Sequence, residues 1–172
     1  MSRELPQITL QQRQMMMTVI WLALIMGVVT FGMIVTFIGL KEEPGKGLPV
    51  ITYLGTGLAA LMLVLRMIIP NMIARNQFTQ AMQEAREEGN QDEEQMLGTF
   101  YQIFMVRMII GLALLEGAAM INLVAVMVEN QKLAFIPVAI LLLVMIASMP
   151  TKSKLDGWIR NQMENYNLEH QN

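Results

Sequence analysis

Long runs of apolar residues separated by short polar stretches are the dominant pattern along this chain. The apolar residues do not form narrow stripes. They fill whole blocks, which reach or approach the roughly 20 residues that a bilayer-spanning helix needs. This pattern predicts an all-α, polytopic integral membrane protein that forms a single membrane domain over residues 1–172. Its four expected transmembrane helices, arranged as two hairpins, cover residues 15–40, 48–69, 99–128 and 133–149.

The polar segments predict how these helices are oriented. The expected tails, 1–14 and 150–172, and the long connection 71–98 carry most of the Lys and Arg residues that lie outside the apolar blocks. The two opposite turns carry only lysines, at positions 41, 46 and 132. The positive-inside rule therefore places both termini and the connection in the cytoplasm. We expect a protein of the cytoplasmic (inner) membrane, with the lipid bilayer as its surroundings.

Two prolines and two aromatic residues mark the boundaries of the predicted spans. Pro70 and Pro150 follow apolar blocks, and they are expected to end the second and fourth helices because proline has no backbone N–H to donate. Trp158 and Tyr166 belong to the residue types enriched at membrane interfaces. We expect them to anchor the C-terminal tail there.

The connection 71–98 combines an amphipathic stretch with an acidic one. Phe78, Met82 and Ala85 recur at i, i+4 and i+7, so residues 71–88 are predicted to form a helix along the membrane surface. The acidic residues that follow lack the ligand spacing and the glycine of an EF-hand. This favours a solvated acidic face over a calcium site.

Composition adds several exclusions. With 54% hydrophobic residues the chain is too apolar for an ordinary soluble domain, and its net charge of −2 indicates no nucleic-acid-binding surface. The sequence has no cysteine, which excludes disulfides and thiolate metal sites. Its single histidine, His170, lies near the C-terminus. We expect no metal ion, no cofactor and no nucleic-acid partner.

Glu116 is the one charged residue in the apolar stretch 108–128. A charged side chain at bilayer depth costs roughly 2.5–3.5 kcal/mol on insertion scales, so such a residue is a candidate functional site by default. Burial in hydrocarbon favours the neutral carboxyl, and contact with water or a cation favours the ionised form. One hypothesis is therefore that Glu116 binds a proton or a sodium ion. The other is that Glu116 and Asn122 hydrogen-bond inside the bundle and hold helices together.

Arg107 and Arg66 are the intramembrane cations nearest to Glu116. Arg107 precedes Glu116 by nine residues, which corresponds to roughly 13.5 Å of helical rise and half a turn. The two side chains are therefore expected on opposite faces of one helix. Arg66 lies close to the cytoplasmic end of its helix, and we expect its head group to reach the interface.

Ala113 and Gly117 form a small-xxx-small pair beside Glu116. Small residues at this spacing let two helices approach closely. We expect this helix to pack against a neighbour within the chain, in a second copy (a homo-oligomer) or in another membrane protein.

The residues around Glu116 resemble a known family. Ile110-Gly-Leu-Ala-Leu114, followed by Glu116 and Leu123-Val124, is similar to the carboxylate helix of the proteolipid (c) subunit of rotary ATP synthases. Ile73-Ala-Arg-Asn-Gln77 resembles that family's polar-loop motif Ala-Arg-Gln-Pro. The resemblance implies that Glu116 binds the transported proton or sodium ion and that Arg75 is a loop residue. The chain departs from the family in the few glycines of its second helix, its longer connection, the missing loop proline and its two additional helices.

The sequence contains no catalytic constellation. It has no Gly-rich phosphate loop, no His-Glu-x-x-His motif and no paired intramembrane aspartates. We therefore predict a non-enzymatic accessory or scaffold protein that acts through helix packing. The alternative is a proton- or cation-binding membrane protein, similar to the proteolipid, that uses Glu116 with Asn122, Arg107 and Arg66 as supporting polar groups.

Overall fold

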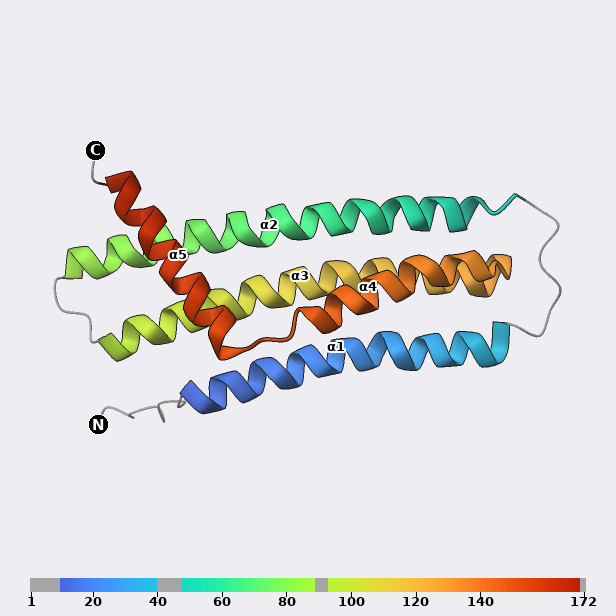
Figure 1. Ribbon diagram of the computed structural model, residues 1–172, viewed down its shortest axis with the longest axis horizontal. Helices are drawn as coiled ribbons and strands as arrows, with labels where there is room; N and C mark the ends of the chain where they lie inside the picture. The colour runs from blue at the N-terminus through green and yellow to red at the C-terminus, as the bar shows by residue number, and fades with distance from the viewer. Residues whose placement is uncertain (1–9, 40–47, 89–92, 171–172) are drawn as a thin grey trace, which may run out of the picture.

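The computed structural model describes residues 10–39, 48–88 and 93–170, and every regular element within these ranges is helical, as predicted (Figure 1). The expected turn at 41–47, most of the N-terminal tail and the side chain of Tyr166 lie outside the described part of the chain. The elements are α1 (Leu10–Gly39), α2 (Val50–Glu88), α3 (Glu93–Glu129), the short 3-10 helix η1 (Lys132–Ala134), α4 (Phe135–Ala147) and α5 (Lys152–His170).

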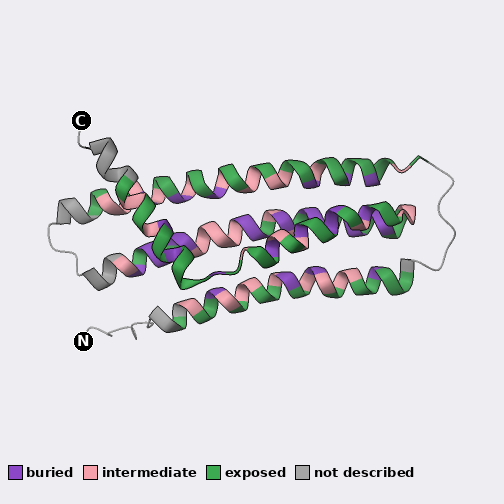
Figure 2. Cartoon of the chain, viewed as in Figure 1, coloured by how far each residue is buried: buried purple, intermediate pink, exposed green. Residues whose placement is uncertain are grey.

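Helix α3 forms the centre of the bundle. It packs against α1, α2 and α4, and Figure 1 shows α1 and α2 along its two sides. Half of its most apolar 18-residue stretch is buried inside the bundle, against 17% for the most apolar stretches of α1 and α2. Figure 2 shows the same contrast, with buried residues concentrated on α3 and exposed residues on the outer helices. The core of the bundle is therefore built around α3.

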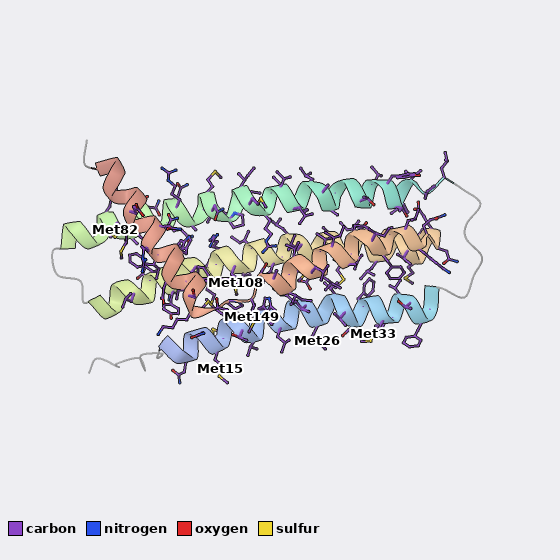
Figure 3. The ribbon with its side chains drawn as sticks, viewed as in Figure 1. Met15, Met26, Met33, Met82, Met108 and Met149 are labelled. Carbon is purple, nitrogen blue, oxygen red and sulfur yellow. The ribbon has the colours of Figure 1, made fainter. Side chains whose placement is uncertain are left out.

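The outer surfaces of the bundle are apolar. Met15, Met26 and Met33 project from α1 away from its neighbours (Figure 3), and each is at least half exposed. Exposed apolar residues in long uncharged helices are typical of lipid-facing surfaces. In the described residues, three helices are long and apolar enough to cross a membrane, and these segments are Gln14–Ile38, Val50–Glu84 and Leu97–Glu129.

Helix α4 differs from these three segments. Its 13 residues span about 20 Å, less than the roughly 30 Å of a bilayer's hydrocarbon core. The segment Lys132–Ala147 is bent by 80° from Lys152–Glu164, and the two provide a fourth span only if the bent pair is taken together. Pro150 lies in this bend, and α4 ends at Ala147, so the expected helix end near this proline is confirmed.

The prediction that Pro70 ends the second helix is wrong, because α2 continues through it to Glu88. Proline removes one helical hydrogen bond to the carbonyl of Arg66 and crowds that carbonyl. Such a defect is tolerated where neighbouring helices enclose it. Pro70 is buried, and Gly111 of α3 leaves room for its ring, since a Cβ atom at Gly111 would lie 3.7 Å from Pro70 Cγ.

The part of α2 beyond Pro70 is not a separate surface helix. Its apolar side packs into an aromatic cluster formed by Phe78 of α2, Phe100 and Phe104 of α3, and Trp158 of α5. The rings of Phe78 and Phe100 stack with their centroids 4.6 Å apart. Trp158 is only 8% exposed, which corrects its expected role as an interfacial anchor. Of the residues that the sequence pattern assigned to a membrane surface, the cluster buries Phe78 and partly buries Met82.

Candidate functional site

Glu116 lies on the side of α3 that faces α1. A Cβ atom built on Gly27 of α1 would lie 3.1 Å from Glu116 Oε1, so the glycine leaves room for the carboxylate. Glu116 is half-buried in this position. Among the described residues, none forms a hydrogen bond or an ion pair with it. Hydrogen bonding within the bundle, one of the two roles predicted for Glu116, is therefore not observed in the described part of the chain.

The two arginines face other partners. Arg107 donates from Nε to Asn71 Oδ1 of α2 at 2.7 Å. Its guanidinium carbon lies 5.8 Å from the ring centroid of Phe104 and 5.9 Å from that of Trp158, within cation–π range. Arg66 is half-buried and donates from Nη2 to Ser148 Oγ, just beyond the end of α4. Both arginines therefore belong to the α5 end of the bundle.

Asn122 ties α3 to α2. It is fully buried, and its Nδ2 donates to the carbonyl of Gly55 at 2.9 Å and to that of Ala118, one turn earlier, at 2.8 Å. Its Oδ1 has no hydrogen-bond partner among the described residues. Gly55 lies so close that a Cβ atom there would be 3.0 Å from Oδ1. The interhelical hydrogen bond expected of Asn122 is therefore present.

Ala113 and Gly117 lie on an exposed face of α3. No atom lies within 4 Å of a Cβ atom built on Gly117. By contrast, Gly27, Gly55 and Gly111 each lie against a side chain from a neighbouring helix. Gly32 likewise lies against Leu123 of α3. Close packing within the bundle thus uses these four glycines, and no described residue packs against Gly117.

Glu129 makes a contact that the sequence pattern did not predict. As the last residue of α3, it accepts hydrogen bonds from the backbone N–H groups of Ile51 (2.6 Å) and Thr52 (2.8 Å), and from Thr52 Oγ1 (2.8 Å). These N–H groups belong to the first turn of α2, where helices have unpaired donors. A carboxylate at this position also interacts favourably with the helix dipole. Asn130 then ends α3 with a φ of 51°, a conformation that asparagine tolerates.

The loop implied by the proteolipid resemblance is not a loop. Residues 73–77 lie inside α2, so Arg75 is a helical residue. Residues 71–88 contain neither glycine nor proline, and their apolar side packs into the aromatic cluster, so the helix continues through them.

No family model, curated protein or solved structure matches this chain.

Proposed function

We propose that this chain is a non-enzymatic accessory or scaffold protein of the cytoplasmic membrane that self-associates through an exposed face of α3. This α3 outer face consists of Ala113, Gly117, Ile121, Val124 and Val128, which recur every three or four residues along one side of the helix. The observation that carries the proposal is the open space at Gly117, on the helix that otherwise forms the centre of the bundle.

A second copy of the chain is the occupant that this face fits. Small residues allow two membrane helices to approach closely, which strengthens their van der Waals packing. A two-fold pairing needs only one self-complementary surface, and two-fold dimers are the commonest homo-oligomers. The outer face runs along the apolar part of α3, so two parallel copies in one membrane are able to pair along it.

The proposed topology has four membrane segments, with both termini and the α2–α3 connection in the cytoplasm. Figure 1 shows the start of α1, the end of α2, the start of α3, and α5 at one end of the bundle. Most of the basic residues outside the apolar blocks belong to segments 1–14, 71–98 and 150–172. The positive-inside rule therefore supports a cytoplasmic location for these segments. The proposed fourth segment covers the predicted span 133–149, which contains α4, and α5 follows the bend on the cytoplasmic side.

Replacing the small residues of the α3 outer face tests self-association. Gly117→Leu and Ala113→Leu are expected to abolish energy transfer between donor- and acceptor-labelled copies in liposomes, because a leucine side chain holds the two α3 backbones apart. Gly57→Leu is the matched control, since Gly57 is also exposed and has no atom within 4 Å of its Cβ position. Energy transfer that is absent in the wild-type chain, or equal in all variants, would overturn the proposal.

The structure also favours a second candidate function, in which Glu116 binds a proton or a monovalent cation. The observation behind it is the carboxylate between α1 and α3, opposite Gly27, which has no partner among the described residues. An apolar setting without a compensating charge favours the neutral carboxyl. An approaching cation or water favours the ionised form, and this exchange is the requirement for carrying an ion.

Carbodiimide labelling in liposomes tests this candidate, because the reagent attacks protonated carboxyls in apolar surroundings. We expect labelling at Glu116 that fades as pH rises or is blocked by sodium, and no labelling at this position in Glu116→Gln. Glu129 provides an internal comparison on the same helix, since its carboxylate is hydrogen-bonded to α2. Labelling that is independent of both pH and sodium contradicts an ion-binding role, as does the absence of labelling at Glu116.

A further inference from the structure

A cavity lies where α4 bends into α5, at the end of the bundle that holds Arg66 and Arg107. Its volume is about 490 Å³, and α2, α3, α4 and α5 all contribute to its walls. Three basic residues line it, Arg66 of α2, Arg107 of α3 and Lys154 of α5. Met108, labelled in Figure 3, marks its place on α3 near α5. We propose that this cavity binds the phosphate group of an anionic phospholipid.

The charges in the cavity are unbalanced. No Asp or Glu is found among the described residues that line it. The cations contact neutral groups instead: Arg66 donates to Ser148, Arg107 to Asn71, and Lys154 Nζ to the carbonyls of Ala147 (2.7 Å) and Met149 (3.2 Å). Arg66 and Arg107 line the same cavity, so their like charges oppose each other there. An anion in the cavity would relieve this repulsion.

The arginines retain donors for such an anion. A guanidinium has five N–H donors, and one hydrogen bond is described for each arginine, from Nη2 of Arg66 and from Nε of Arg107. The planar fork of arginine matches phosphate oxygens in a bidentate arrangement. Two arginines and a lysine that converge on one cavity therefore provide the donor set of a phosphate site.

The position of the cavity along the bundle indicates a lipid as the source of the phosphate. Arg66 lies sixteen residues from Val50, the start of α2, and Arg107 lies 22 residues from Glu129, the end of α3. These separations correspond to roughly 24 Å and 33 Å, about one hydrocarbon thickness from the opposite end of the bundle. The cavity is thus placed at the depth of lipid head groups, where basic pockets between helices bind anionic lipids.

The surroundings of the cavity also fit a lipid better than a free phosphate ion. Leu143 and Ile146 are exposed on α4, within a turn or so of Ala147, which lines the cavity. They offer an apolar surface for acyl chains beside the cationic site. On the other side, α5 turns by 80° from α4, so it lies across the axis of the bundle, as expected of a helix in the plane of the interface.

Lipid retention by the full chain in a neutral detergent tests the proposal. Native mass spectrometry would be used to titrate the protein with phosphatidylglycerol, with phosphatidylcholine and with inorganic phosphate. We expect phosphatidylglycerol to bind at least about tenfold more tightly than phosphatidylcholine, since only the phosphatidylglycerol head group carries a net negative charge. Equal binding of the two lipids would overturn the proposal. Binding of inorganic phosphate at the same concentrations, with displacement of the lipid, would show a site for free phosphate and would overturn the lipid assignment.

Charge-removing variants show whether the retained lipid occupies this cavity. Arg66→Gln and Arg107→Gln are each expected to weaken phosphatidylglycerol binding about tenfold, the effect of losing one charge-assisted contact. Arg160→Gln is the matched control, because Arg160 is exposed on α5 and does not line the cavity. It is expected to change binding by about twofold or less. Equal losses in all three variants would overturn the proposal.

Size-exclusion chromatography and circular dichroism show whether the arginine variants fold. If one does not, lysine variants test whether the lipid occupies the cavity. Both lysines are exposed, but only Lys154 lines the cavity, and Lys152 lies two residues earlier. Lys154→Gln is expected to weaken phosphatidylglycerol binding by about fivefold. Lys152→Gln is expected to leave it nearly unchanged, and an equal effect of the two substitutions would contradict the proposal.

Discussion

Polar side chains inside this apolar bundle are accommodated by glycines on the neighbouring helices. Glu116 lies against Gly27, and Asn122 lies against Gly55. The fit at Gly55 is the tightest, since a Cβ atom there would lie 3.0 Å from Asn122 Oδ1 and 3.3 Å from Cγ. Two hydrogen bonds hold the Asn122 amide in place, so it cannot move aside without losing one of them.

Gly55→Ala is therefore expected to lower the free energy of unfolding by about 1–3 kcal/mol, the usual effect of overpacking a tight interior. Unfolding by SDS in mixed micelles measures this effect. Gly57→Ala is the matched control, because Gly57 lies two residues away on α2 in open space. This variant is expected to gain up to about 1 kcal/mol from helix propensity. Equal stability of the two variants would show that Asn122 does not require a glycine opposite it.

The helices of this protein owe their arrangement at the α5 end to the aromatic cluster. Phe78 and Phe100 are at most 1% exposed. Trp158 packs edge-on against Phe78, with the ring centroids 6.1 Å apart. Because these residues come from α2, α3 and α5, the cluster joins three helices. It also explains why α2 continues as a packed helix beyond Pro70.

Phe100→Ala is expected to destabilise the protein by about 3–5 kcal/mol, because it removes a fully buried ring and leaves a cavity in the cluster. The free energy of unfolding, measured under the same micellar conditions, gives this quantity. Phe37→Ala is the control, since Phe37 is 74% exposed on α1 and its loss creates no cavity. A loss of stability at Phe37 equal to that at Phe100 would contradict the role of the cluster.

The described helices form a bundle in which α4 runs back toward the end where α1 begins. η1 follows α3 closely, and α5 lies at the opposite end of the bundle (Figure 1). If the bundle spans a membrane, Lys132 of η1 and Lys152 of α5 must lie on opposite sides of it. The sequence contains no cysteine, so single cysteines introduced at these positions give an unambiguous readout.

In intact cells, a membrane-impermeant maleimide is expected to label Lys132→Cys and to leave Lys152→Cys and Gln80→Cys unlabelled until the membrane is permeabilised. The three positions are exposed, so accessibility depends on the side of the membrane and not on burial in the protein. Labelling of the same variants in detergent controls for thiol reactivity. Labelling of residues 132 and 152 from the same side would exclude the proposed fourth membrane segment.

Local properties of the chain were sufficient to predict the helical class and the membrane-length segments. Hydrophobicity and the lack of charge over 20 or more residues act on each segment separately, so α1, α2 and α3 are visible in the sequence before any packing is known. The same is true of the small-residue pair at Ala113 and Gly117, and of the unusual position of Glu116.

The enclosure of individual residues could not be predicted in this way. Pro70 continues a helix, Arg75 is helical and Trp158 is buried because other helices surround this part of α2 and α5. Such contacts depend on residues far away in the chain, as with the bond between Glu129 and Thr52, which are 77 positions apart. For the same reason, Arg66, Arg107 and Lys154 meet in one cavity although they lie on three helices and no local pattern connects them.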